Sequence, residues 1–207
     1  MLQITTKIVL PSTKRFATYS FTEKIYFLSW LCVIPLPFLL MADLASSKFT
    51  GFLGLSALIL TIIGTTGPLF ETEPLYGKFT EDITITEKGI TYRDTFYPFH
   101  SIQDFKVEMK SFYRQRTGKS RSGPKYFRGI NNHIFFISDN TIVHEYFLIS
   151  SGTEFEELQT IINRAIVKEM LPFRHSYLDM VSENYKQTEE YHQFVRKIKQ
   201  KNHTFVS

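Results

Sequence analysis

Cysteine is almost absent from this chain of 207 residues, which holds one, Cys32. A single cysteine excludes an intrachain disulfide framework and a metal site built from several thiolates. The six histidines show neither an H-x-x-x-H nor an H-E-x-x-H spacing, and the chain has no G-x-S-x-G, Walker or G-x-G-x-x-G motif. Glu71 and Glu73 follow an apolar run, and we interpret them as an interfacial boundary rather than an acid–base pair. We therefore expect no catalytic residues, no metal and no cofactor, and interpret the protein as a non-enzyme.

Charged residues are missing from two long stretches. Residues 25–42 (IYFLSWLCVIPLPFLLMA) and 49–70 (FTGFLGLSALILTIIGTTGPLF) hold no Asp, Glu, Lys, Arg or His. As helices they would be about 27 and about 33 Å long, close to the hydrocarbon thickness of about 30 Å. A soluble helix of this length normally carries a polar stripe, and a signal peptide has a shorter apolar region. The sequence therefore predicts a transmembrane hairpin with the lipid bilayer as its partner, connected by residues 43–48 (DLASSK).

The distribution of cations predicts the orientation of this hairpin. Lys and Arg resist translocation and accumulate on the cytoplasmic side. The arm before the first run carries four cations, the connector one, and the segment after the second run two: Lys7, Lys14, Arg15 and Lys24; Lys48; Lys78 and Lys88. Both termini are therefore expected in the cytoplasm. The net charge of +4 suits an anionic neighbour such as the cytoplasmic leaflet.

Proline and small residues interrupt the two apolar runs. Pro35 and Pro37 predict an irregular outer half of the first run, either a static kink or a hinge. In the second run, Gly51, Gly54, Ser56 and Ala57 are candidates for packing against the first helix or against another copy in a homo-oligomer. The absence of a G-x-x-x-G pair makes the indication of self-association weak.

Alternating apolar residues predict a β-rich domain after the second run. Strands are expected at 81–86 and 90–93 around Gly89, at 95–99 as an edge or a corner, and at 102–113. A second hairpin is expected at 134–137 and 143–148, where His133 and His144 could meet across the strands. Residues 4–10 (ITTKIVL) are interpreted as a strand that pairs with this domain, the alternative being a loose arm.

Two helices are predicted after the strands. Residues 153–170 have a helical apolar period, and Thr153 with Glu156 forms a capping-box pattern at their start. Residues 177–199 show a narrower apolar seam, which suits a helix packed on the domain or a partner-binding tail. The predicted fold class is membrane α+β, a two-helix transmembrane hairpin followed by a small antiparallel β-barrel or sandwich with C-terminal helices. The expected domains are a cytosolic arm (1–24), the hairpin (25–70), the β-domain with its closing helix (75–171) and a basic helical tail (172–207).

A basic loop is the most conspicuous polar segment. Residues 114–128 (RQRTGKSRSGPKYFR) carry six cations: Arg114, Arg116, Lys119, Arg121, Lys125 and Arg128. Such a loop could contact an anionic leaflet or grip the phosphates of a nucleotide or nucleic acid. The alternative is a solvated loop without a specific ligand.

The order of elements, with GITYRD, YPFHSI and the helix after EYFLISS as the nearest approach to motifs, resembles the pleckstrin-homology (PH) fold. Two spans followed by such a domain resemble bacterial membrane proteins of the YcxB-like type, and are similar to the two-span membrane effectors of bacterial antiphage systems, including retron transmembrane effectors.

The effector resemblance implies an inner-membrane protein whose cytosolic domain senses a partner or ligand and whose spans damage the membrane in abortive infection. It also implies control by a regulatory protein or a reverse transcriptase with its DNA or RNA, for which the basic loop is one possible contact. The alternative is a membrane-anchored PH-like adaptor that binds a protein or anionic lipid.

Overall fold

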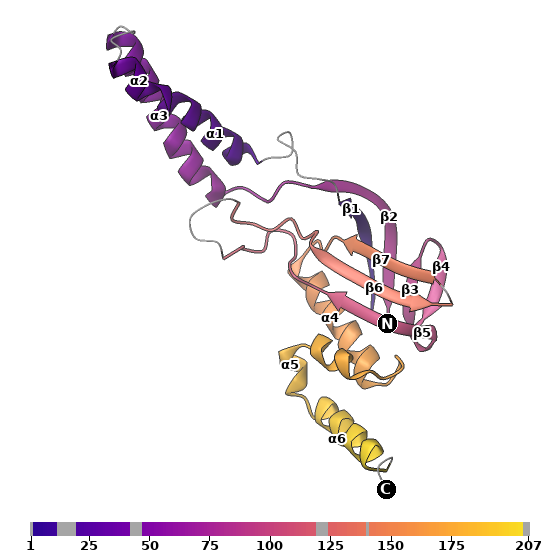
Figure 1. Cartoon of the computed structure of the whole chain (residues 1–207). Helices are drawn as coiled ribbons and strands as arrows, with labels where there is room; N and C mark the ends of the chain where they lie inside the picture. The colour runs from indigo at the N-terminus through magenta and orange to yellow at the C-terminus, as the bar shows by residue number, and fades with distance from the viewer. Residues whose placement is uncertain (1, 12–19, 42–46, 119–123, 140, 205–207) are drawn as a thin grey trace. The chain divides into compact units, whose positions relative to one another are not determined.

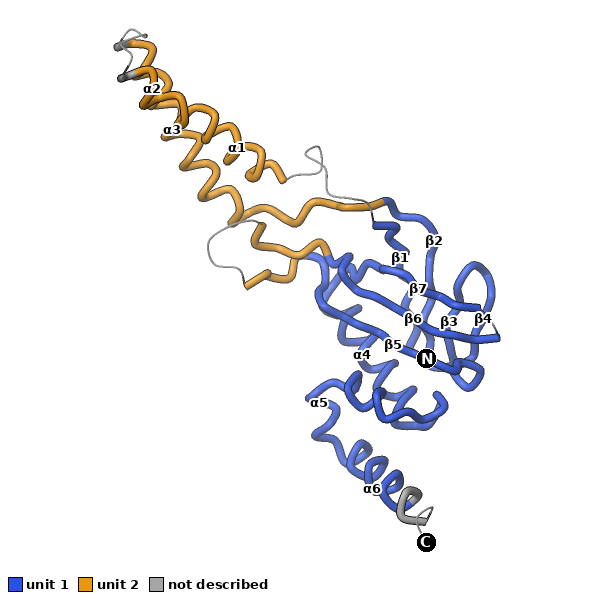
Figure 2. The backbone as a smooth tube through the Cα atoms, viewed as in Figure 1, with its two compact units in different colours: residues 1–11, 78–113, 129–207 blue, residues 12–77, 114–128 orange. Residues whose placement is uncertain are grey.

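The computed structural model describes residues 2–11, 20–41, 47–118, 124–139 and 141–204. Its contacts divide the chain into two units, shown in different colours in Figure 2. The sheet unit comprises Met1–Pro11, Lys78–Tyr113 and Gly129–Ser207. The helix-pair unit comprises Ser12–Gly77 and Arg114–Arg128. Each unit is therefore assembled from segments that are separated in the sequence.

Seven strands form one open antiparallel sheet, in the order β4-β3-β2-β1-β7-β6-β5 (Figure 1). The strands are β1 (Gln3–Pro11), β2 (Gly77–Thr86), β3 (Gly89–Tyr92), β4 (Thr95–Pro98), β5 (Ile102–Glu108), β6 (Asn132–Ser138) and β7 (Thr141–Phe147). The predicted N-terminal strand is confirmed and is the central strand of the sheet, between β2 and β7. The edge position predicted for residues 95–99 is also confirmed by β4.

The inner face of the sheet holds the core of this unit. Ile134, Phe136 and Ser138 alternate with partly exposed residues along β6, as a strand with one buried face requires. The sheet curls, since the Tyr97 ring on β4 lies 5.2 Å from that of Phe136 on β6 and the Tyr92 hydroxyl donates to Glu145 on β7 at 2.8 Å. The described edge strands β4 and β5 do not pair with each other, so the domain predicted as a β-barrel or sandwich contains one open, curved antiparallel sheet.

Helix α4 (Gly152–Val167) contributes a buried apolar face to the same core: Leu158, Ile161, Ile162, Ala165 and Ile166. The expected helix is confirmed, but its predicted capping box is wrong. Ser151 is the N-cap, and its hydroxyl accepts the N–H of Glu154 at 3.1 Å. Thr153 already lies inside the helix.

The C-terminal segment is not the single helix predicted for residues 177–199. It consists of η4 (His175–Met180), α5 (Glu183–Lys186) and α6 (Glu189–Thr204). The break is held by Asn163, whose side chain accepts the N–H of Ser182 at 3.1 Å and donates to its hydroxyl at 2.9 Å. Tyr177, Phe194 and Ile198 are buried in the core, as expected for a packed tail.

The second unit is built on α1 (Phe21–Val33), α2 (Pro35–Met41), α3 (Ser47–Thr66) and the short η2 (Gly67–Leu69). Two stretches, Phe21–Leu39 and Lys48–Leu69, are long and apolar enough to cross a membrane. The first helix begins four residues before the predicted boundary at 25, because Ser20 and Glu23 form a complete capping box. Its charged first turn hides this start from an apolar-run criterion.

Within residues 25–41, the described part of the first apolar stretch, the helix is interrupted only at Ile34. The outer half predicted to be irregular is the regular helix α2, which begins at Pro35. Proline is well tolerated at the first position of a helix, because the N–H it lacks would have no helical partner there. Pro37 follows within the same first turn. The predicted connector lies outside the described residues, apart from its last two positions.

Candidate functional site

The start of α1 is tied to the segment that follows α3. Glu71 places one carboxylate oxygen 2.6 Å from the backbone nitrogen of Phe21 and the other 3.2 Å from that of Thr22. The second oxygen also accepts the hydroxyl of Thr22. The first N–H groups of a helix have no helical acceptor and carry partial positive charge, so a carboxylate is well suited to this position. Glu71 therefore links the start of α1 to the segment that follows α3. We call this end of the helix pair, with Phe21, Thr22 and residues 67–71, the base.

A seam of small residues lets α1 and α3 approach. Ala57 is buried, the hydroxyl of Thr61 lies 2.8 Å from that of Ser29, and a Cβ on Gly64 would lie 2.8 Å from Cδ2 of Tyr26. Gly67 likewise has no room for a Cβ beside Thr22. The seam thus runs along α3 from Ala57 toward the base.

The predicted packing residues only partly coincide with this seam. Ala57 belongs to it and Ser56 is half-buried beside it. Around Gly51 and Gly54, no described atom lies within 4 Å of where a Cβ would be. A side chain at these two positions would therefore not interfere with packing against the first helix.

The predicted basic loop contains a two-armed β-like hairpin. We call its described residues, 114–118 and 124–128, the basic hairpin. Its arms exchange backbone hydrogen bonds, from Arg114 to Phe127 at 3.0 Å, from Phe127 to Gln115 at 2.8 Å and from Thr117 to Lys125 at 2.8 Å. Arg114 and Gly118 adopt left-handed backbone conformations with φ of 64° and 67°.

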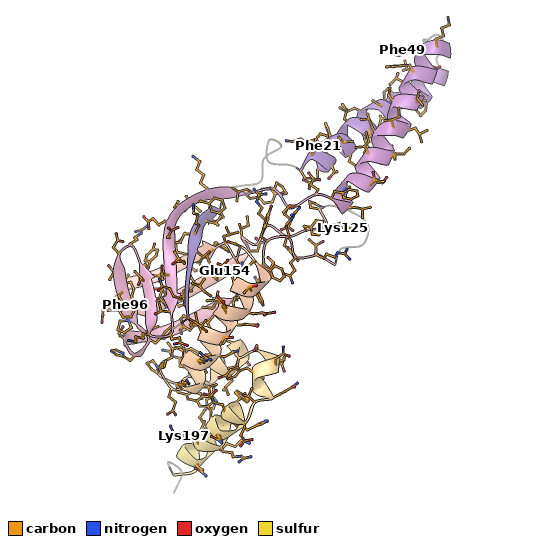
Figure 3. All side chains as sticks on the ribbon, turned by 180° about the vertical axis from the view of Figure 1, so that it is seen from behind. Phe21, Phe49, Phe96, Lys125, Glu154 and Lys197 are labelled. Atoms are coloured by element: carbon orange, nitrogen blue, oxygen red, sulfur yellow. The ribbon has the colours of Figure 1, made fainter. Side chains whose placement is uncertain are left out.

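This hairpin is hydrogen-bonded to the end of α3. The N–H of Lys125 donates to the carbonyl of Pro68 at 2.9 Å, and the N–H of Tyr126 to that of Glu71 at 3.3 Å. The N–H of Glu73 donates back to Tyr126 at 2.8 Å. Figure 3 shows Lys125 and Phe21 toward the same end of the helix pair, and Phe49 at the other. The backbone thus fixes the hairpin arms at the base.

Four of the six predicted cations fall in these arms. Arg114 and Arg116 are exposed, whereas Lys125 and Arg128 are half-buried. Lys119 and Arg121 lie outside the described residues. Within the described part of the chain, the guanidinium groups of Arg114, Arg116 and Arg128 form no ion pair. The base therefore presents cations whose charge is not neutralised by neighbouring carboxylates.

Large apolar side chains are exposed beside these cations. Phe70 is 83% exposed, Phe21 67% and Leu69 47%, all at the end of the helix pair where the hairpin is attached. Exposed aromatic and aliphatic side chains and the arms of the basic hairpin therefore occur at the same end of the helix pair.

The predicted histidine pair lies on the sheet unit. The ring centroids of His133 and His144 are 4.3 Å apart, and the buried Nε2 of His133 has no hydrogen-bond partner among the described residues. Burial, reinforced by His144, lowers the pKa of His133. In the described ranges no three His, Cys, Asp or Glu side chains form a group that could hold a metal ion. The pair is thus a contact between neighbouring strands.

Asn132 organises the ends of β5 and β6, and sequence reasoning missed it. It is fully buried, and its Oδ1 accepts the N–H groups of Lys110 at 2.8 Å and Ser111 at 3.1 Å. Its Nδ2 donates to the carbonyls of Ser111 at 2.9 Å and Gly129 at 2.7 Å. These bonds replace the strand ladder, which explains why β5 ends at Glu108 and not at the predicted residue 113.

Comparisons of the chain with family models, curated proteins and solved structures found no match. The most distinctive features of the two units are the apolar helix pair and the cations at its base.

Proposed function

We propose that this protein is a two-span protein of the bacterial inner membrane. The observation that carries this proposal is the exposure of its two apolar helices, of which only 11% and 17% of the residues in the most apolar windows are buried. The core helix of a soluble protein would be largely covered by other parts of the chain. Exposed residues along the helices include Trp30, Phe38, Phe52, Leu55 and Leu58, which are favourable in lipid and costly in water.

The cations at the base support an orientation with both termini in the cytoplasm. Arg114, Arg116 and Lys125 lie in the hairpin that is bonded to the end of α3, and cations near the ends of spans favour the cytoplasmic side. The sheet unit is then cytosolic. Its curved antiparallel sheet, packed against α4, supports the PH-like assignment.

We propose further that the protein acts as a non-enzymatic membrane effector, whose cytosolic domain receives a partner or ligand and whose spans then perturb the membrane. The connectivity supports coupling of this kind. The helix pair is inserted in the chain between β1 and β2, which are neighbours in the sheet. The segment Arg114–Arg128, which contains the basic hairpin, links β5 to β6. A rearrangement of the sheet would therefore be transmitted to the base of the helix pair through the chain connections to both helices and through the basic hairpin, which a simple anchor would not need.

We propose that this activity serves abortive infection, and the resemblance to antiphage effectors supports this setting. In that setting, the controlling partner is a protein or a protein–nucleic-acid complex encoded nearby, such as a reverse transcriptase with its DNA or RNA. This part of the proposal rests on the order of elements.

A membrane-anchored PH-like adaptor is the second candidate. It is favoured by the closed seam between α1 and α3, in which Ser29 bonds to Thr61, and by the exposed hydroxyls of Thr65 and Thr66, which donate to carbonyls of their own helix. The described part of a single helix pair therefore offers lipid a mainly apolar surface. Perturbation of the membrane would then require several copies or an opened pair.

Membrane potential and dye entry in bacteria induced to express the chain test the effector directly. The matched control replaces residues 12–77 with an Asn-Gly turn, which preserves β1. The hydroxyls of Thr5 and Thr84 lie 3.0 Å apart, so antiparallel pairing brings the end of β1 next to the start of β2, where a two-residue turn fits. A deletion of residues 1–70 would instead remove the central strand.

We expect depolarisation with the full chain and none with the control that lacks the helix pair. If expression alone has no effect, we expect this result when the neighbouring genes are present and the cells are challenged with phage. An unchanged potential in both conditions would contradict the effector and leave the adaptor.

A further inference from the structure

We propose that the basic hairpin binds the phosphate headgroups of anionic phospholipids around the base of the helix pair. This inference rests on the proposed membrane location, and it names the ligand of the candidate site. It is carried by the four described cations of the hairpin: Arg114, Arg116, Lys125 and Arg128.

The first argument is the fixed position of the hairpin. Its backbone is bonded to Pro68, Glu71 and Glu73, which flank the last exposed apolar residues of the second span, Leu69 and Phe70. The hairpin arms therefore stay close to the point where the apolar second span ends, at Leu69 and Phe70. When the helices are in a bilayer, the headgroups of one leaflet lie at that level.

The second argument is the chemistry of the side chains. Three of the four cations are arginines, whose planar forks bind two phosphate oxygens at once. None of the three is engaged by a carboxylate among the described residues. Within the described ranges, no ion pair of these three arginines has to break before a phosphate binds.

The third argument favours lipid over nucleic acid. Phe21, Leu69 and Phe70 are exposed at the same end of the unit as the cations. A bilayer covers such apolar side chains and supplies phosphate beside them, whereas a nucleic-acid backbone supplies only the phosphate. The combination of both surfaces therefore matches the membrane interface.

The single tryptophan allows this selection of lipid to be measured in the full chain. Trp30 is 55% exposed and follows Phe21 by nine positions, so it lies about 13 Å along the helix from the base, within the same leaflet. The purified protein is reconstituted in phosphatidylcholine vesicles containing phosphatidylglycerol, with brominated chains on one lipid or the other. Quenching of Trp30 then reports which lipid surrounds the base.

The variant Arg114→Gln/Arg116→Gln/Arg128→Gln removes three cations from the base. The matched control, Lys88→Gln/Lys168→Gln/Lys199→Gln, removes three exposed cations from the sheet unit. A cation near an anionic leaflet contributes about 1 kcal/mol, which is about a fivefold change in an equilibrium constant. We expect a several-fold preference for phosphatidylglycerol in the wild type and in the control, and a ratio near one in the arginine variant.

A third variant, with lysine at the same three positions, keeps the charge and loses the forks, so a partly retained preference is expected. The inference would be overturned if the ratio of Trp30 quenching by the two brominated lipids were equal in the wild type and the Gln variant. It would also be overturned if the arginines proved necessary for binding a short DNA or RNA strand at physiological salt while the lipid ratio stayed unchanged. Recovery of the chain in the soluble fraction of cells would instead contradict the membrane location itself.

Discussion

The carboxylate of Glu71 accepts the backbone N–H of Phe21 at 2.6 Å, so a residue that follows the second apolar helix caps the first. Replacing Glu71 with Ala removes this acceptor together with those for the N–H and hydroxyl of Thr22. We expect the helix pair to lose about 1–3 kcal/mol of stability. Thermal unfolding of the full chain in detergent, followed by helical circular dichroism, measures the change.

Glu156→Ala is the charge-matched control for this substitution, because Glu156 is exposed on α4. It should leave the helix pair unaffected. Equal midpoints for the two variants would show that Ser20 alone suffices to cap α1.

The small-residue seam predicts opposite outcomes for two glycines of α3. A Cβ on Gly64 would lie 2.8 Å from the ring of Tyr26, whereas one on Gly54 meets no described atom within 4 Å. Gly64→Ala should therefore push the helices apart at a cost of about 1–3 kcal/mol. Gly54→Ala should be neutral or stabilising by up to about 1 kcal/mol, because alanine favours the helix. Midpoints in the same unfolding assay compare the two, and a stabilising Gly64→Ala would contradict the seam.

Local sequence patterns predicted where the helices and strands of this protein occur better than which of them pair or pack together. The period of 3.6 residues in α4 and the alternation in β6 reflect which face of each element is buried, and both are visible in the sequence. The central position of β1 in the sheet is not visible in the sequence. Its partner β7 lies far along the chain, and the pairing depends on the fold of the whole sheet. Likewise, nothing in residues 177–199 shows that Asn163 holds Ser182 in a turn.

The candidate site was predictable to a similar extent. Its cations were visible as a cluster, but their attachment to Pro68 and Glu71 through backbone hydrogen bonds leaves no trace in the residue types. The role of Glu71 was missed for a related reason. A carboxylate after an apolar run looks like a boundary residue, and only the tertiary structure brings it to the N-terminus of another helix.

Asn132 provides a sharp test of the sheet unit, because its neighbour Asn131 is exposed. Asn132→Ala would leave the N–H and the carbonyl of the buried Ser111 without their side-chain partner. Each unsatisfied group costs about 1–3 kcal/mol, so we expect a loss of at least about 2 kcal/mol. Asn131→Ala should change stability by less than about 0.5 kcal/mol. Denaturant midpoints measure both, and similar values would refute the proposed role.

The start of α4 offers two Ser or Thr positions, each followed three residues later by Glu. The structure selects Ser151, whose hydroxyl accepts the N–H of Glu154. Ser151→Ala should therefore cost about 1 kcal/mol, the usual value of an N-cap. Thr153→Ala, inside the helix, should be nearly neutral or slightly stabilising because alanine has the higher helix propensity. The reverse order of the two midpoints would restore the cap predicted from the sequence.

His133 predicts how the stability of the sheet unit depends on pH. Burial and the neighbouring His144 lower the pKa of His133 in the folded state, whereas the unfolded chain retains a value near 6.5. As the pH falls through about 6.5, the unfolded state binds the proton first, so the free energy of unfolding decreases by at most about 1.4 kcal/mol per pH unit. Acidification from about pH 7.5 toward 5.5 should therefore destabilise the wild type.

The charged neighbours of His133 fix the interpretation of this test. Lys106 and Lys110 oppose its protonation and Glu108 favours it, but the pKa of Glu108 is about 2 because of hydrogen bonds and charge from these lysines. Glu108 thus stays ionised throughout the range and adds no slope. His133→Gln should flatten the pH dependence, while His192→Gln, at an exposed position of α6, should preserve it. A slope retained by His133→Gln would show that His133 is not the group responsible for the pH dependence.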